Sequence, residues 1–114
     1  MAISDLRLAN AGVGAGARGG AILNLGTLVL ERVAVTGNSA GDAGGGLYNG
    51  GSLTVRASVF SANSVTDATC AGGGAIRSDG AGSSVLLVDS TVSGNSAAAC
   101  NGGGLSFSRG QARV

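Results

Sequence analysis

The chain has 114 residues, of which 23 are glycine, and it contains no proline, histidine, lysine or tryptophan. Seven arginines against six acidic residues give a formal charge of +1, which predicts neither nucleic-acid binding nor attraction to an anionic membrane. Hydrophobic residues make up 44% of the chain, which excludes a disordered protein, and glycine follows no three-residue period, which excludes a collagen-like one. No apolar run approaches the ~20 residues of a membrane-spanning segment. The first residues lack the basic and apolar segments of a signal peptide, and the length suits one domain.

After a candidate strand at residues 3–8, the chain repeats itself. Residues 22–38 align without a gap on 47–63, at a constant offset of 25 (47 − 22 and 63 − 38). A third copy begins at Ile76 and a fourth at Leu105. The first apolar residue precedes the strand by six residues in two copies (22 to 28, 47 to 53) and by nine in the third (76 to 85), whereas strand and asparagine are always ten apart. Constant strands joined by connections of variable length are typical of a stacked solenoid.

Within each copy the apolar residues recur with a period of two, which indicates β-strands, and the glycine clusters would interrupt any helix. Tandem hairpins are disfavoured because no short turn recurs at a fixed place. We therefore predict an all-β parallel β-helix of about four coils, a single domain and part of a longer helix. The expected coils are approximately 3–21, 22–46, 47–75 and 76–104, with a partial coil at 105–114.

The repeat predicts a narrow core in which equivalent apolar residues stack from coil to coil. The glycine clusters are expected at the bends, where they supply positive φ and let neighbouring backbones approach. The predicted rows are Ile22, Leu47, Ile76 and Leu105; Leu28, Leu53 and Val85; Leu30, Val55 and Leu87; and Val35, Phe60 and Val92.

Two short motifs recur in every copy. The first is Gly-Gly-Ala-Ile at 19–22 and 73–76, with Gly-Gly-Gly-Leu at 44–47 and 102–105; the second is Phe-x-x-Asn at 60–63, with Val-x-x-Asn at 35–38 and 92–95. This pair resembles the polymorphic outer membrane protein repeat of bacterial surface proteins, within the pectate-lyase-like right-handed parallel β-helix superfamily. The resemblance extends over about residues 3–114. It implies a right-handed coil and an extracellular or cell-surface location.

The asparagines Asn38, Asn63 and Asn95 form the repeated polar row. We expect an asparagine ladder at a turn, with each amide bonded to backbone or to the next amide. The alternative is a row of ligands for sugar or calcium, which is disfavoured because calcium sites need clustered carboxylates.

The two cysteines occupy similar places in consecutive coils, since Cys70 and Cys100 each stand two residues before a glycine triplet. Stacking would bring their Cα atoms to about 5 Å, within disulfide range. We predict a disulfide, with a pair of buried thiols as the alternative; a metal site is not expected without histidine or further cysteine.

Enzymatic β-helices of the resembled superfamily place acidic residues and Arg or Lys on neighbouring coils of one outer face. In the aligned repeats Glu31 stands opposite Arg56 of the next coil, which predicts a surface ion pair between the two residues. Asp89 shares a row with Arg32 and Ala57, so no two acids stack in adjacent coils. A shallow site remains a minor alternative at the loop residues Asp42, Asp67 and Asp79. The two outward rows, Thr27, Ser52 and Ser84 and then Val29, Thr54 and Leu86, are too irregular and too apolar to favour ice binding. Residues 11–20 lack the lysine of a phosphate loop.

The patterns predict a non-catalytic structural or adhesion segment without cofactor or metal, and the resemblance implies that it belongs to a secreted or cell-surface bacterial protein. Its partner would be a glycan or a cell-surface protein contacted by a solenoid face, and its uncapped end coils favour end-to-end self-association. The alternative is the non-catalytic portion of a polysaccharide lyase or hydrolase.

Overall fold

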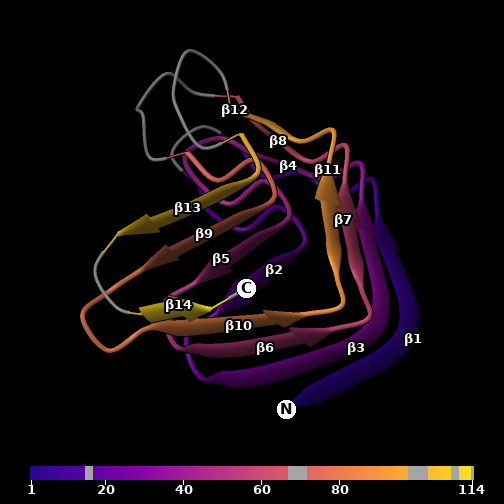
Figure 1. Ribbon diagram of the computed structural model, residues 1–114. Coiled ribbons are helices and arrows are strands. Elements are labelled where there is room, and N and C mark those ends of the chain that lie inside the picture. Colours follow the sequence, from indigo (N-terminus) through magenta and orange to yellow (C-terminus); the bar gives the residue numbers. More distant parts are fainter. Residues whose placement is uncertain (15–16, 67–71, 98–102, 109–110, 114) are drawn as a thin grey trace.

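The computed structural model describes residues 1–14, 17–66, 72–97, 103–108 and 111–113. These residues form strands and turns without any helix, and all strand pairs are parallel (Figure 1). The predicted all-β solenoid, a parallel β-helix, is confirmed. A large sheet contains β1 (Ala2–Ala9), β3 (Thr27–Thr36), β6 (Ser52–Arg56), β7 (Val59–Ser61), β10 (Ser84–Val88), β11 (Thr91–Ser93) and β14 (Gln111–Arg113). A three-stranded sheet contains β4 (Ser39–Ala40), β8 (Ser64–Val65) and β12 (Ser96–Ala97), and a four-stranded sheet contains β2 (Ile22–Asn24), β5 (Leu47–Asn49), β9 (Ile76–Asp79) and β13 (Leu105–Ser108).

Successive coils lie directly on one another, as the pairing along the large sheet shows. Ala2 pairs with Val29, Val29 with Thr54, Thr54 with Leu86, and Leu86 with Arg113. The chain thus returns to the same place after 27 (29 − 2), 25 (54 − 29), 32 (86 − 54) and 27 (113 − 86) residues. Figure 1 shows these strands as a stack whose colours follow the sequence from β1 to β14. The differences in coil length fall outside the paired segments, as the repeat predicts.

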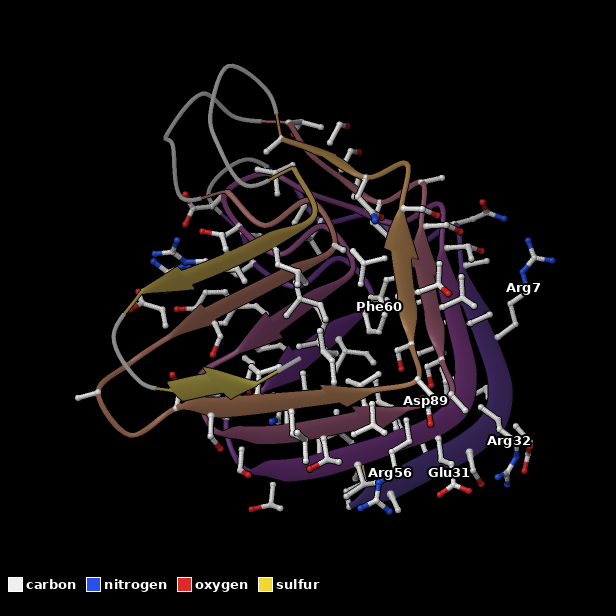
Figure 2. All side chains as sticks on the ribbon, viewed as in Figure 1. Arg7, Glu31, Arg32, Arg56, Phe60 and Asp89 are labelled. Carbon is white, nitrogen blue, oxygen red and sulfur yellow. The ribbon has the colours of Figure 1, made fainter. Side chains whose placement is uncertain are left out.

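The core lies between the sheets, and its largest buried side chains are aliphatic or aromatic. Leu30, Val55 and Phe60 are fully buried, and Figure 2 shows the Phe60 side chain pointing into the interior. Equivalent residues stack because the strands are parallel and in register, so no single coil buries its apolar face without its neighbours. In-register pairing joins Ile22, Leu47, Ile76 and Leu105; Leu28, Leu53 and Val85; Leu30, Val55 and Leu87; and Val35, Phe60 and Val92.

The glycine triplets serve two separate needs at the bend before the four-stranded sheet. Gly44 has a φ of 64°, a left-handed conformation that L-residues with side chains rarely adopt. Gly45 has no such φ, but a Cβ atom there would overlap the carbonyl oxygens of Gly74 and Ser64 in the next coil. The backbones therefore approach one another at the second glycine more closely than any side chain allows.

A sharp corner in the large sheet is formed by residues other than glycine. Asp5, Arg32, Ala57 and Asp89 stand at equivalent positions with φ between 48° and 55°. Each turns the strand through the corner while its side chain stays outside, and Figure 2 shows Arg32 and Asp89 on the outer surface. The sequence placed Arg32, Ala57 and Asp89 in one row but carried no sign that the row is a left-handed corner. Such a conformation costs an alanine or arginine about 1–2 kcal/mol.

Candidate functional site

The asparagines at the turn before the three-stranded sheet are bonded to one another, and Asn38 and Asn63 are fully buried. Asn38 Nδ2 donates to Asn63 Oδ1 (3.0 Å), and Asn63 Nδ2 donates to Asn95 Oδ1 (2.9 Å). The same oxygens also accept the backbone N–H groups of Asn38 (3.1 Å) and Asn63 (2.9 Å). Each amide also donates to the carbonyl oxygen of an earlier coil, as Asn63 Nδ2 does to Val35 O (2.8 Å). At the N-terminal end of the row stands Ala11, whose N–H donates to Asn38 Oδ1 (2.9 Å). With their amides engaged in this way, these asparagines hold adjacent coils together.

A second polar row, which the repeat analysis missed, lies on the inner side of the four-stranded sheet. Asn24 Nδ2 donates to Asn49 Oδ1 (2.8 Å), and Asn49 Nδ2 donates to Ser78 Oγ (3.2 Å). The signal was available in the alignment, because Asn24 and Asn49 are 25 residues apart (49 − 24). The third copy carries serine at this position, so no asparagine repeated in all three copies marks the row. At the corner of the large sheet, at the other end of β6, the buried Ser58 accepts the N–H of Val33 at 3.0 Å.

The predicted ion pair between Glu31 and Arg56 is wrong. The two residues, both within the described part of the chain, are Cα partners as the register requires, but no ion pair joins them. Glu31 instead bonds to its neighbour Arg32, which also binds Asp5 through two hydrogen bonds of 2.6 and 3.0 Å. The left-handed corner at Arg32 explains the difference, because it sets the guanidinium between the two carboxylates. The hydrogen bond from Arg32 lowers the pKa of Asp5, and both carboxylates raise the pKa of Arg32.

Two of the three acidic residues that were expected in loops, Asp42 and Asp79, lie in the described part of the chain, away from this corner. Asp42 lies in a loop, as expected, whereas the prediction of a loop for Asp79 is wrong because this residue ends β9. Asp67, Cys70 and Cys100 lie outside the described residues, so the disulfide stays a prediction.

A polar cluster lies on the outer side of the four-stranded sheet, around Tyr48. Arg18 Nε donates to Asp42 Oδ2 (2.9 Å) and Arg18 Nη1 donates to the Tyr48 hydroxyl (3.3 Å), while the guanidinium carbon stands 5.0 Å from the ring centroid. Arg77 pairs in register with Tyr48, and its guanidinium lies 3.8 Å from a carboxylate oxygen of Asp79. We call Arg18, Asp42, Tyr48, Arg77 and Asp79 the Tyr48 cluster.

The Tyr48 cluster is partly buried and rigidly supported. The side chains of Asp42 and Arg77 are each 15% exposed, whereas that of Arg18 is 52% exposed. The hydrogen bond from Arg18 to Asp42 is the largest cause of the raised pKa of Arg18, with further contributions from Tyr48 and Asp79. The ring and the carboxylate therefore hold one guanidinium at a fixed place on the surface. A guanidinium has five N–H donors, so Arg18 has donors beyond those that bind Asp42 and Tyr48.

The described residues contain no group of three potential metal ligands and show no closed pocket. Tyr48 itself is buried, and Arg18 is the most exposed member of the Tyr48 cluster. Arginine donors and carboxylate acceptors of this kind are able to bind hydroxyl, carbonyl or carboxylate groups.

Comparison of the sequence with protein-family models, with curated proteins and with solved structures finds no match. In the part of the chain that the structure describes, no helix is long and apolar enough to cross a membrane.

Proposed function

We propose that this protein is a non-catalytic segment of a secreted or cell-surface bacterial protein, with a structural and adhesive role. Its solenoid presents the Tyr48 cluster to a glycan or to a surface protein. The resemblance of the Gly-Gly-Ala-Ile and Phe-x-x-Asn motifs to the polymorphic outer membrane protein repeat supports the location and the adhesive role.

The observation that carries this proposal is the fixed position of Arg18. Its guanidinium is held by Asp42 and Tyr48, which are supported in turn by the strands and bends of adjacent coils. A donor group that is already ordered loses little conformational entropy when it binds. Tyrosine and arginine are also enriched at protein interfaces.

A binding screen tests the proposal. The purified protein is applied to a glycan array and to extracted surface proteins, and each ligand found is retested with Arg18→Ala and Arg77→Ala. We expect each substitution to weaken binding at least about tenfold, which corresponds to ~1.4 kcal/mol. The matched control is Arg56→Ala, because Arg56 is exposed on the large sheet and outside the cluster; it should leave binding unchanged.

The outcomes separate the hypotheses. Binding that survives both cluster substitutions, or no binding to any glycan or surface protein, would overturn the assignment of this face. Release of sugars from acidic polysaccharides in a parallel assay would contradict the non-catalytic role and favour the polysaccharide-active alternative.

A further inference from the structure

We propose that Asn49 is a modification site that the fold protects: in the unfolded protein it reacts with the peptide nitrogen of Gly50, and the product cannot return to the native structure. Asn49 is fully buried in the second polar row, yet it is followed by the residue that hinders this reaction least. The protein would therefore lose molecules irreversibly each time it unfolds.

The reaction needs only water. The backbone nitrogen of Gly50 attacks Cγ of Asn49 and forms a bond to it. The bond between Cγ and Nδ2 breaks, and the proton that the Gly50 nitrogen loses leaves with Nδ2 as ammonia. The five-membered imide that results is then opened by water at either carbonyl, giving aspartate or isoaspartate. Glycine favours the first step because it has no Cβ to obstruct the approach and its backbone reaches unusual conformations easily.

The native structure prevents this approach by engaging both reacting groups. The N–H of Gly50 donates to Asn24 O at 2.8 Å, so its nitrogen is held in the β-ladder. The Asn49 side chain donates from Nδ2 to Gly51 O (3.0 Å) and Ser84 O (3.1 Å), and its Oδ1 accepts the N–H of Gly51 (3.2 Å). The attack requires Gly50 N to leave Asn24 O and Asn49 Nδ2 to leave its two acceptors, which amounts to opening this part of the coil.

The product is incompatible with the same surroundings. Deamidation replaces the Asn49 amide nitrogen by an oxygen that would face the carbonyl oxygens of Gly51 and Ser84, with no hydrogen to offer them when ionised. A buried carboxylate against two acceptors carries a large desolvation and repulsion penalty. The isoaspartate product adds a backbone atom at the end of β5, which displaces the residues that follow from their register.

Asn24 provides an internal comparison. It occupies the same row and makes equivalent bonds, with Nδ2 donating to Gly26 O (3.3 Å) and Ser52 O (3.1 Å), but it is followed by Leu25. The branched leucine obstructs attack, so Asn24 should remain intact under conditions that modify Asn49. Asn101, the other asparagine that precedes glycine, calibrates the reaction in the unfolded protein.

The first test compares folded and unfolded protein at mildly alkaline pH, with peptide mass spectrometry at Asn49. In denaturant, Asn49 should react as fast as Asn101 while Asn24 stays intact. In native buffer the rate at Asn49 should fall by roughly 10³-fold or more, because it is limited by the small unfolded fraction. A native rate within a few-fold of the unfolded rate would overturn the proposed protection.

Variants test the consequence for refolding. Gly50→Ala is the matched control, since a Cβ there meets only the flexible Leu25 side chain within 3.4 Å (Cδ2 at 3.0 Å) and Gly50 has no left-handed φ. After long incubation in denaturant, Gly50→Ala should keep a refolding yield that the unmodified sequence loses in step with modification at Asn49. Equal losses in the two proteins would contradict the proposal.

Direct substitutions of Asn49 distinguish the effect of a buried charge from the effect of losing the amide side chain. Asn49→Ser should fold, because Ser78 fills the same row in the next coil. Asn49→Asp should fail to fold at neutral pH and recover in part in acid, where the carboxyl is neutral in both states. An Asn49→Asp variant that folds as stably as Asn49→Ser at neutral pH would refute the claim that modification is irreversible.

Discussion

The central asparagine of the first polar row offers the sharpest test of how the coils are joined. In Asn63→Ala, four side-chain hydrogen bonds vanish: two donated to Val35 O and Asn95 Oδ1, and two accepted from Asn38. Some partners keep another bond, since Asn38 Nδ2 still donates to Leu8 O and Asn95 Oδ1 still accepts the N–H of residue 63. One buried group, the N–H of Asn38, loses the bond that Asn63 supplies, whereas Val35 O stays within the parallel ladder of β3 and β7.

An unsatisfied buried polar group costs about 1–3 kcal/mol, so the orphaned N–H of Asn38 predicts a loss of about that size. The assay is urea unfolding followed by circular dichroism, with Asn95→Ala as the matched control. Asn95 is partly exposed, and its removal leaves Asn63 Nδ2 bonded to Val35 O, so we expect about half the loss. If Asn63→Ala costs less than about 0.5 kcal/mol, or no more than Asn95→Ala, the row does not hold the coils as argued.

Three further predictions concern the corner, the bend and the surface charges. Ala57→Gly should raise the free energy of unfolding by about 0.5–1 kcal/mol in the same assay, since it relieves a φ of 48°; a loss of stability would contradict the strain. Gly45→Ala should destabilise by about 1–3 kcal/mol or prevent folding, whereas Gly82→Ala, with open space around its Cβ, should change the midpoint little; similar effects at both sites would refute the close approach. Asp5→Asn should leave the midpoint of thermal unfolding nearly unchanged, because the bond to Arg32 is exposed. Since the pKa of Asp5 is lowered in the folded state, its contribution is present above the ordinary carboxyl pKa and is lost as pH falls through the folded value.

The fold could be predicted because the sequence repeats. An offset of 25 aligns Leu28 with Leu53 and Asn38 with Asn63, and parallel strands convert equal offsets into spatial neighbours. The glycine bends were also foreseeable, as no other residue combines positive φ with the absence of a Cβ.

Details that depend on a single residue's conformation could not be predicted. The ion pairing of Glu31 follows from the left-handed corner at Arg32, and arginine carries no signal for that conformation. The Tyr48 cluster joins residues from separate coils whose spacing follows no repeat, because Arg18 stacks on a ring 30 residues later (48 − 18). The repeat period predicts which residues stack in a row from coil to coil, but it does not predict contacts between side chains of different rows.

The spacing of 25 residues between equivalent positions of β3 and β6 also affects how the gene can change in length. Gly26 and Ser52 are already neighbours, since the N–H of Ser52 donates to Gly26 O at 2.8 Å. Deleting the 25 residues 27–51 (51 − 26) would join these two residues directly and bring later coils onto earlier ones without changing which side chains face inward. Unequal recombination between copies of the repeat could therefore shorten or extend the protein by whole coils, with selection acting on length separately from packing.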